Sequence, residues 1–310
     1  MEKAGILDEA TAARDAGPAA GGIWRGFAAL VVATHALIVL GALVRVHGAG
    51  LACPDWPLCF GEWIPRFDFQ IAFEWSHRVL AGSVALGFAA LAALLWPRLP
   101  AGDPLRRALA VAAAGLLVQI LLGALTVWQL LDFRTVTAHL LVGNGVAAAF
   151  LWIALELRAR TRPPSPTPVS TGVRRALALA IALLALQMAL GGMVSSQYAG
   201  PVCPEWPTCA GGVWFPSWGG LVGLHLLHRL NGYALVAALF GLAWATRGTP
   251  RLGPLALGLA ALGAAQLLVG VANVLTGIPV EVTGLHSFLA TALVLTATAA
   301  ARACWGRSAA

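Results

Sequence analysis

The side chains best suited to chemistry form a short block from Glu74 to Arg78, Glu-Trp-Ser-His-Arg, at the start of a long apolar run. Positions three apart share one face of an α-helix, so the Glu74 carboxylate and the His77 imidazole would lie side by side near one end of a membrane span. Ionisable groups are costly in hydrocarbon and usually mark a functional site. We therefore expect chemistry at this end of the span.

A partial copy of the block follows 151 positions later, from His225 to Arg229. The copy keeps the His-Arg pair as His228 and Arg229, but a histidine stands where the first block has Glu74. Only the first block thus carries an acid three residues before the histidine of its His-Arg pair. A carboxylate there could act as a base or stabilise developing charge, so we place the reaction in the first half of the chain.

Four of the seven histidines share a depth in the expected spans. Each falls about four to seven residues after the outer start of an even-numbered span, within about 10 Å of the surface. They are His77, His139, His228 and His286. A single imidazole on an apolar helix is more often a core residue, but four at one depth favour two haem irons, each held between facing helices. We pair His77 with His139 and His228 with His286. Zinc or copper is the alternative, although isolated histidine pairs make poor closed zinc sites.

Three arginines fit the same interpretation. Arg78 and Arg229 directly follow a predicted ligand, and Arg45 lies at the outer end of the first span. Guanidinium groups bind carboxylates such as haem propionates through two hydrogen bonds. For Arg45, extension of the side chain to the membrane surface is an equally good explanation.

Two cysteine pairs share the spacing Cys-x5-Cys with two intervening prolines. They are Cys53 with Cys59 and Cys203 with Cys209. Both lie in expected outer loops, where disulfides persist, so we predict two disulfides. A four-thiolate metal site is the alternative, but it usually shows Cys-x2-Cys spacing. Cys304 is expected to be unpaired.

The composition identifies the element type that must position these groups. Of 310 residues, 59% are hydrophobic and 11% charged, and the mean hydropathy is +0.80. Such a chain is an all-α integral membrane protein, because a bilayer core needs about 20 apolar residues per helix. The eight expected spans are roughly 24–46, 71–96, 105–128, 134–156, 174–197, 222–246, 252–276 and 282–304.

The basic residues predict the orientation, because cytoplasmic loops are enriched in Lys and Arg. With eight spans, fifteen of the 20 basic residues fall on one side: Lys3, Arg14, Arg25, Arg98, Arg106, Arg107, Arg158, Arg160, Arg162, Arg174, Arg175, Arg247, Arg251, Arg302 and Arg307. Both termini are then cytoplasmic, and the cysteine loops and histidines lie toward the outer face. The net charge of +7 follows from this topology, so it gives no support to nucleic-acid binding.

The spans form a repeat. The cysteine motifs recur at an offset of 150, and the segment Gln119-x3-Gly123 recurs as Gln266-x3-Gly270 at 147. We therefore predict two parallel, pseudo-symmetric four-helix bundles related by an axis along the membrane normal. The expected organisation is a cytoplasmic tail 1–22, a first half 23–157, a Pro/Arg-rich cytoplasmic linker 158–173, a second half 174–304 and a cytoplasmic tail 305–310. The Gln-x3-Gly pattern, also present at 187/191, indicates either helix packing or close approach to a macrocycle.

The combined pattern from about residue 23 to 304 resembles the haem A synthase family. The matching pieces are Val44-Arg45, Gly48-Ala-Gly-Leu51, the first cysteine loop, the Glu74 block, Gln119-x3-Gly123 with Thr126-Val127, and the four histidines. The resemblance implies oxidation of the haem o methyl group to the formyl group of haem a. It places substrate haem o at His77 and His139, resident haem b at His228 and His286, and a functionally important carboxylate at Glu74. Some family members lack the cysteine pairs, which makes the thiols unsuitable as core catalytic groups.

The resemblance also implies a setting. We expect a multi-pass protein of a prokaryotic plasma membrane, in contact with lipid, haem o synthase and cytochrome oxidase assembly; the sequence allows a homo-oligomer. Two other functions fit parts of the pattern. A di-haem cytochrome passing electrons from quinol to an outer acceptor would use the same histidines but not the single Glu74. A parallel-repeat transporter would place polar groups near the bilayer midplane instead.

Overall fold

The structure is a computed structural model that describes residues 2–161 and 169–306, with side chains from residue 22 onward. Its helices are α1 (Glu2–Val46), α2 (Phe69–Leu95), α3 (Pro104–Trp128), α4 (Phe133–Thr161), α5 (Thr171–Ser196), α6 (Gly220–Ala245), α7 (Leu252–Leu275) and α8 (Val280–Trp305). Within the described residues, eight segments, including Gly22–Val46 of α1, are long and apolar enough to cross a membrane. The prediction of an all-helical, multi-pass membrane protein is confirmed.

The expected boundaries hold to within two or three residues at most helix ends. Two helices differ more: α1 begins at Glu2, within the expected tail 1–22, and α4 continues to Thr161 and so takes in four residues assigned to the linker. The four linker prolines, Pro163, Pro164, Pro166 and Pro168, lie outside the described residues. Aspartates begin two of the helices: Asp68 accepts a hydrogen bond from the backbone N–H of Ile71, and Asp103 accepts one from Leu105. Such caps satisfy donors that the first helical turn leaves free.

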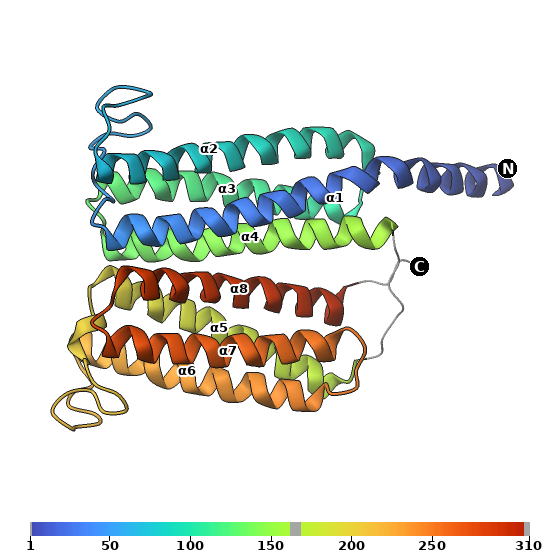
Figure 1. Ribbon diagram of the computed structural model, residues 1–310. Helices are drawn as coiled ribbons and strands as arrows, with labels where there is room; N and C mark the ends of the chain where they lie inside the picture. Colours follow the sequence, from blue (N-terminus) through green and yellow to red (C-terminus); the bar gives the residue numbers. More distant parts are fainter. Residues whose placement is uncertain (1, 162–168, 307–310) are drawn as a thin grey trace.

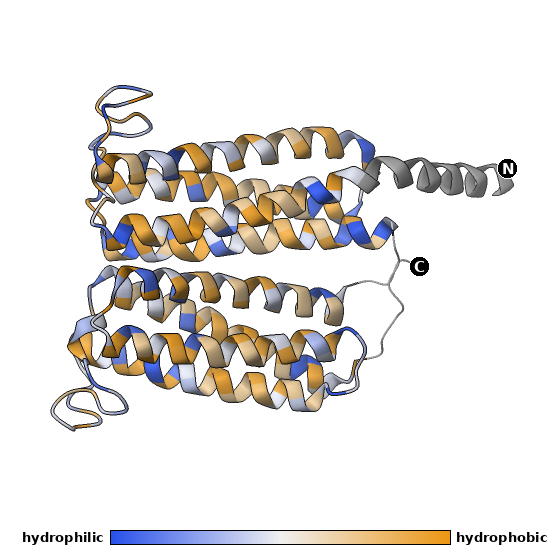
Figure 2. Ribbon diagram, viewed as in Figure 1, coloured by the Kyte–Doolittle hydropathy of each residue, from blue (hydrophilic) through white to orange (hydrophobic). Residues whose placement is uncertain are grey.

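Helices α1–α4 lie together, as do α5–α8, and α8 runs beside α1 and α4 (Figure 1). The two cysteine loops project from one end of the helices, called here the loop end (Figure 1). The α2–α3 connection, the end of α4 and the start of α5 lie at the opposite end, called the linker end (Figure 1). Apolar residues dominate the helices between these ends (Figure 2). The fold therefore gathers both cysteine loops at one surface.

Each half has its own hydrophobic core, and both cores lie mainly toward the linker end. In the first, the rings of Phe27, Phe88 and Phe150 pack with centroids 5.1–6.4 Å apart. In the second, buried leucines such as Leu177 and Leu259 fill the corresponding region. The loop-end part of each bundle is thereby left to a different set of side chains, which includes the four histidines.

Candidate functional site

The four predicted ligand histidines occupy matching places near the loop end. Each lies six to eight residues after the first residue of its helix, on α2, α4, α6 and α8. His77 and His139 lie within electrostatic range of each other, and so do His228 and His286. The fold thus makes neighbours of the two pairs that the repeat suggested.

Each histidine ring packs against a glycine of the preceding helix. A Cβ atom built on that glycine would come within 3.0–3.2 Å of a ring atom. The pairs are Gly41 with His77, Gly123 with His139, Gly191 with His228, and Gly270 with His286. This separation is tighter than an ordinary van der Waals contact, so a larger side chain would displace the imidazole. The last three glycines belong to the Gln-x3-Gly motif, which therefore positions the histidines.

Glutamine amides adjoin two of the rings. Gln119 Nε2 lies 3.3 Å from His139 Nε2, and Gln187 Nε2 lies 3.2 Å from His228 Nδ1. Asn231 donates to Gln187 Oε1 at 2.7 Å, which fixes that amide in turn. The position four residues before Gly41 holds Leu37 instead of a glutamine. The His77 ring accordingly lacks the amide that its counterpart His228 has.

The donor set fits haem better than a closed metal site. Four side-chain atoms here are buried and have no hydrogen-bond partner in the described part of the chain: His139 Nδ1, His286 Nδ1, Gln119 Oε1 and Gln266 Oε1. Within the described residues, no three His, Cys, Asp or Glu side chains cluster so that they could hold a metal ion. Isolated imidazole pairs are donors that could hold a haem iron, whereas structural zinc needs about four protein ligands.

Glu74 is buried, at 5% exposure, and both of its oxygens are engaged. Oε2 accepts a hydrogen bond from the backbone N–H of Cys53 at 2.8 Å, and Oε1 forms an ion pair with Arg78 Nη2 at 2.5 Å. In the second half, His225 takes the corresponding place, and its Nδ1 lies 2.8 Å from the carbonyl oxygen of Ala199. The carboxylate thus ties α2 to the first cysteine loop.

Arg78 and Arg229 hold the cysteine loops by backbone carbonyls. Arg78 donates to the carbonyl oxygens of Cys53, Asp55 and Leu58. Arg229 donates in the same way to those of Cys203, Glu205 and Thr208. These contacts were not foreseen from the sequence, because spacing along one helix does not reveal what a loop places opposite it.

The cysteine loops contain both predicted disulfides, Cys53–Cys59 and Cys203–Cys209, while Cys304 is free and buried. The Asp55 carboxylate accepts hydrogen bonds from the backbone N–H groups of two loop residues, Phe60 and Gly61. These bonds, led by that from Gly61, lower the pKa of Asp55.

Glu205 caps the second loop similarly through Gly211 and Gly212. The bond from Gly212 is the largest cause that lowers the pKa of Glu205. An ionised carboxylate therefore closes each loop.

Two further polar residues lie between the halves. The Arg45 guanidinium of α1 lies 4.6 Å from the ring centroid of Tyr198, which follows α5. His35 of α1 stacks on Phe288 of α8 with ring centroids 4.5 Å apart, and its Nε2 lies 3.1 Å from the Phe288 carbonyl oxygen. Both contacts link α1 to the second half.

Known proteins are similar to this chain over most of its length. Over 314 aligned residues the chain is 29% identical to the haem A synthase of Rhizorhabdus wittichii, covering 86% of this chain and 89% of that protein. It is 28% identical to the haem A synthase of Shewanella oneidensis, covering 86% and 92%. A shorter match, 32% identical over 124 residues, relates 40% of this chain to 27% of the protohaem IX farnesyltransferase of Halobacterium salinarum.

The sequence model of one protein family covers nearly all of the helical region. This model, COX15-CtaA, described as cytochrome oxidase assembly protein, matches residues 24–72 and 66–298. The matched segments include both cysteine loops, Glu74 and all four histidines. The chain therefore belongs to the COX15-CtaA family of cytochrome oxidase assembly proteins.

Proposed function

We propose that this protein acts in haem A biosynthesis and oxidises the methyl group of haem o to the formyl group of haem a. The observation that carries the proposal is the two pairs of half-buried imidazoles near the loop end, each ring in contact with a glycine of the preceding helix. The chain belongs to the COX15-CtaA family, and its match to two haem A synthases covers most of their length. Both findings support haem as the group that these imidazoles bind.

We assign substrate haem o to His77 and His139, and resident haem b to His228 and His286. Two asymmetries support this assignment. The second half fixes His228 through Gln187 and Asn231, as suits a permanently bound group. The first half lacks that glutamine beside His77 but has the buried Glu74 one helical turn away.

We also infer that the halves are related by an axis along the membrane normal, so that the two haems lie at equal depth. Each half contains two histidine–glycine pairs, one disulfide and one arginine, Arg78 or Arg229, that donates to loop carbonyls. This recurrence supports the relation. Equal depth would place both haem sites beneath the cysteine loops.

When bound, the haem iron supplies the redox chemistry for methyl oxidation. The imidazoles would hold the haem. The cysteine loops, which Arg78 and Arg229 anchor, would exclude water from it. Because both Glu74 oxygens already accept hydrogen bonds from charged or backbone donors, Glu74 is better placed to stabilise positive charge than to take up a proton. Propionate binding by Arg45, Arg78 and Arg229 remains a prediction, since Arg78 and Arg229 donate here to loop carbonyls.

The proposed setting is a prokaryotic plasma membrane, with both termini cytoplasmic and the haem sites toward the outer face. The excess of basic residues at the linker end supports this orientation. We further propose contact with haem o synthase and with cytochrome oxidase assembly, because haem o is apolar and must pass between membrane proteins.

A haem inventory tests the proposed reaction. The purified protein, expressed in a host that makes haem o but lacks its own haem A synthase, would be extracted and its haems identified by mass spectrometry. We expect haem b together with haem o and haem a. Haem b alone, in a fully loaded protein from such a host, would contradict the reaction and favour an electron-transferring di-haem cytochrome.

A further inference from the structure

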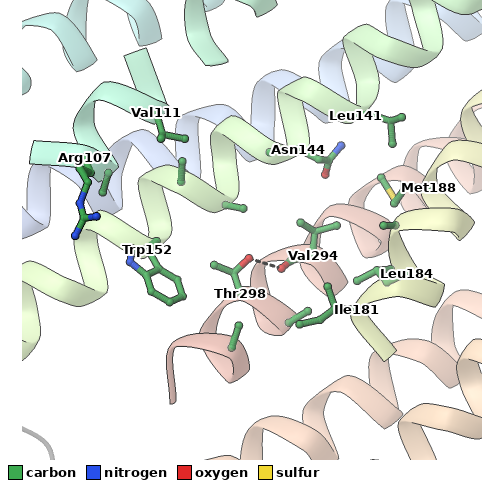
Figure 3. Close-up of a pocket in the computed structure, with 17 residues that line it drawn as sticks. Arg107, Val111, Leu141, Asn144, Trp152, Ile181, Leu184, Met188, Val294 and Thr298 are labelled. Carbon is green, nitrogen blue, oxygen red and sulfur yellow. Dashed lines mark hydrogen bonds between the residues drawn. The ribbon is translucent and has the colours of Figure 1, made fainter. Parts of the chain in front are cut away.

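An apolar cleft of about 600 Å³ lies between the two halves. None of the four histidines lines it. It is lined by α3 and α4 on one side and by α5 and α8 on the other (Figure 3). Its walls include small side chains, among them Gly145 and Ala148 of α4 and Ala297 of α8. Arg107 and Trp152 lie toward the linker end of the cleft. A cleft of this shape admits a flat or chain-like apolar molecule from the bilayer.

One polar group lies deep in this cleft. Asn144 is 3% exposed, and its Nδ2 donates to the Leu140 carbonyl oxygen at 2.9 Å. Its Oδ1 is buried and has no hydrogen-bond partner among the residues that the structure describes. Figure 3 shows Asn144 opposite the side chains of Met188 and Val294. Buried acceptors are nearly always satisfied, so this oxygen calls for a donor from a bound molecule.

The position of Asn144 restricts what that donor can be. It lies eight residues from Trp152 along α4, or about 12 Å into the membrane from the linker-end mouth. A buried water needs two to four polar partners, and the other cleft walls are almost entirely apolar. A phospholipid phosphate accepts hydrogen bonds and stays at the headgroup level near Arg107. The required molecule carries a hydroxyl donor on a body that moves freely within hydrocarbon.

We propose that this cleft binds a membrane hydroquinone of the isoprenoid class, with one ring hydroxyl donating to Asn144 Oδ1 and the tail leaving toward lipid. Asn144 lies five residues after His139 on α4, which puts the two side chains on different sides of that helix. The ring would lie about 7–8 Å from His139 along the helix axis. The site belongs to neither half alone and is separate from the histidine pairs.

Photolabelling tests this proposal without any turnover. The full chain, in nanodiscs of phosphatidylcholine, would be labelled with a reduced azido-ubiquinone and its peptides mapped. We expect label in residues 141–152 and 181–188, and displacement by unlabelled decylubiquinol. Asn144→Leu removes the acceptor and should lower labelling about tenfold, the loss expected for about one hydrogen bond to a bound ligand. Ala148→Phe fills the cleft and should lower labelling at least as much, because the ring no longer fits.

Ala114→Phe provides the matched control, because Ala114 is exposed on α3 outside the cleft. It should label like the unaltered protein. Gel filtration and the haem spectrum show whether each variant is folded. If one of the two cleft variants does not fold, the labelling of the other one tests the proposal. Three results would overturn the proposal. The label could lie in other peptides, the folded cleft variants could label like the unaltered protein, or phosphatidylglycerol but not decylubiquinol could displace the label. These outcomes are independent of whether the protein forms haem a, so failure here is distinguishable from failure of the proposed function.

Discussion

At the scale of single residues, Glu74 decides between a structural and a functional interpretation of the first half. It is buried, paired with Arg78 and bonded to the Cys53 N–H. An exposed pair of this spacing contributes only about 0.2–0.5 kcal/mol to helix stability. The partly desolvated carboxylate can instead act electrostatically on a group bound at His77, one helical turn away.

Glu74→Gln tests that role. The amide keeps the shape and can still accept from Cys53, but it removes the negative charge. We expect turnover of haem o to fall about 10²-fold or more, with both haem sites retained, because charge stabilisation is lost while the fold is not. The measurement is single-turnover conversion with optical haem quantification. If the variant contains its full haem complement and converts haem o at the normal rate, Glu74 only anchors the first cysteine loop.

At the scale of helices, the glycine opposite each histidine sets how closely two helices approach. Gly191→Ala would place a Cβ atom 3.0 Å from His228 Cε1. We expect the shifted ring to weaken the low-spin haem spectrum of the second half. Gly241→Ala on α6 is the control, since nothing lies within 4 Å of its Cβ. It should keep the spectrum and gain about 0.5–1 kcal/mol of stability, because alanine favours a helix interior. Equal spectra in both variants would show that these glycines only pack helices.

The linker end contains a pH-sensitive contact between α3 and α4. Asp103 caps α3 and receives two hydrogen bonds from Arg160 at 2.7 Å each. The Arg160 bonds are the main cause that lowers the pKa of Asp103. A lowered pKa means that the contact stabilises the fold fully above the ordinary aspartate pKa of about 3.9 and is lost as pH falls below it.

Thermal unfolding in detergent between pH 7 and pH 3 measures this contribution. The unaltered protein should lose more stability than Asp103→Asn over that range, so the two melting temperatures converge at low pH. A constant difference across the range would show that the contact does not depend on the charge of Asp103.

Much of the fold follows from local sequence, but the contacts between elements do not. Apolar runs of about 20 residues predict the helices, and the Cys-x5-Cys spacing in loops predicts both disulfides. The extension of α4 past residue 156 was missed, because Glu156 and Arg158 look like the end of a span. In the structure Glu156 is instead paired with Arg302 of α8 at 2.7 Å. The glycine seats of the histidines likewise depend on which helices become neighbours.

At the scale of the whole molecule, the disulfides report on orientation. In intact spheroplasts, a membrane-impermeant maleimide should label none of the four loop cysteines before reduction and all four after it, because both disulfides lie at the loop end and that end is proposed to face outward. Buried Cys304 should stay unlabelled in both cases. Loop labelling only after the cells are opened would reverse the orientation, and labelling without reductant would mean that the thiols are free in the membrane.

The two halves, for which we propose different functions, are joined by side-chain contacts. Arg45 with Tyr198, His35 with Phe288, and Arg302 with Glu156 connect them across their interface. These contacts could not be predicted from a repeat, since a repeat relates equivalent positions and an interface joins unlike ones.

The central claim is that the first half converts haem o while the second half keeps haem b. Its most direct test compares His77→Ala with His228→Ala in a host that makes haem o, by optical spectrum and by mass spectrometry of the extracted haems. We expect His77→Ala to keep the low-spin haem b spectrum and to form no haem a, and His228→Ala to lose that spectrum. A His77→Ala protein emptied of haem b beside a His228→Ala protein that retains it would contradict the division.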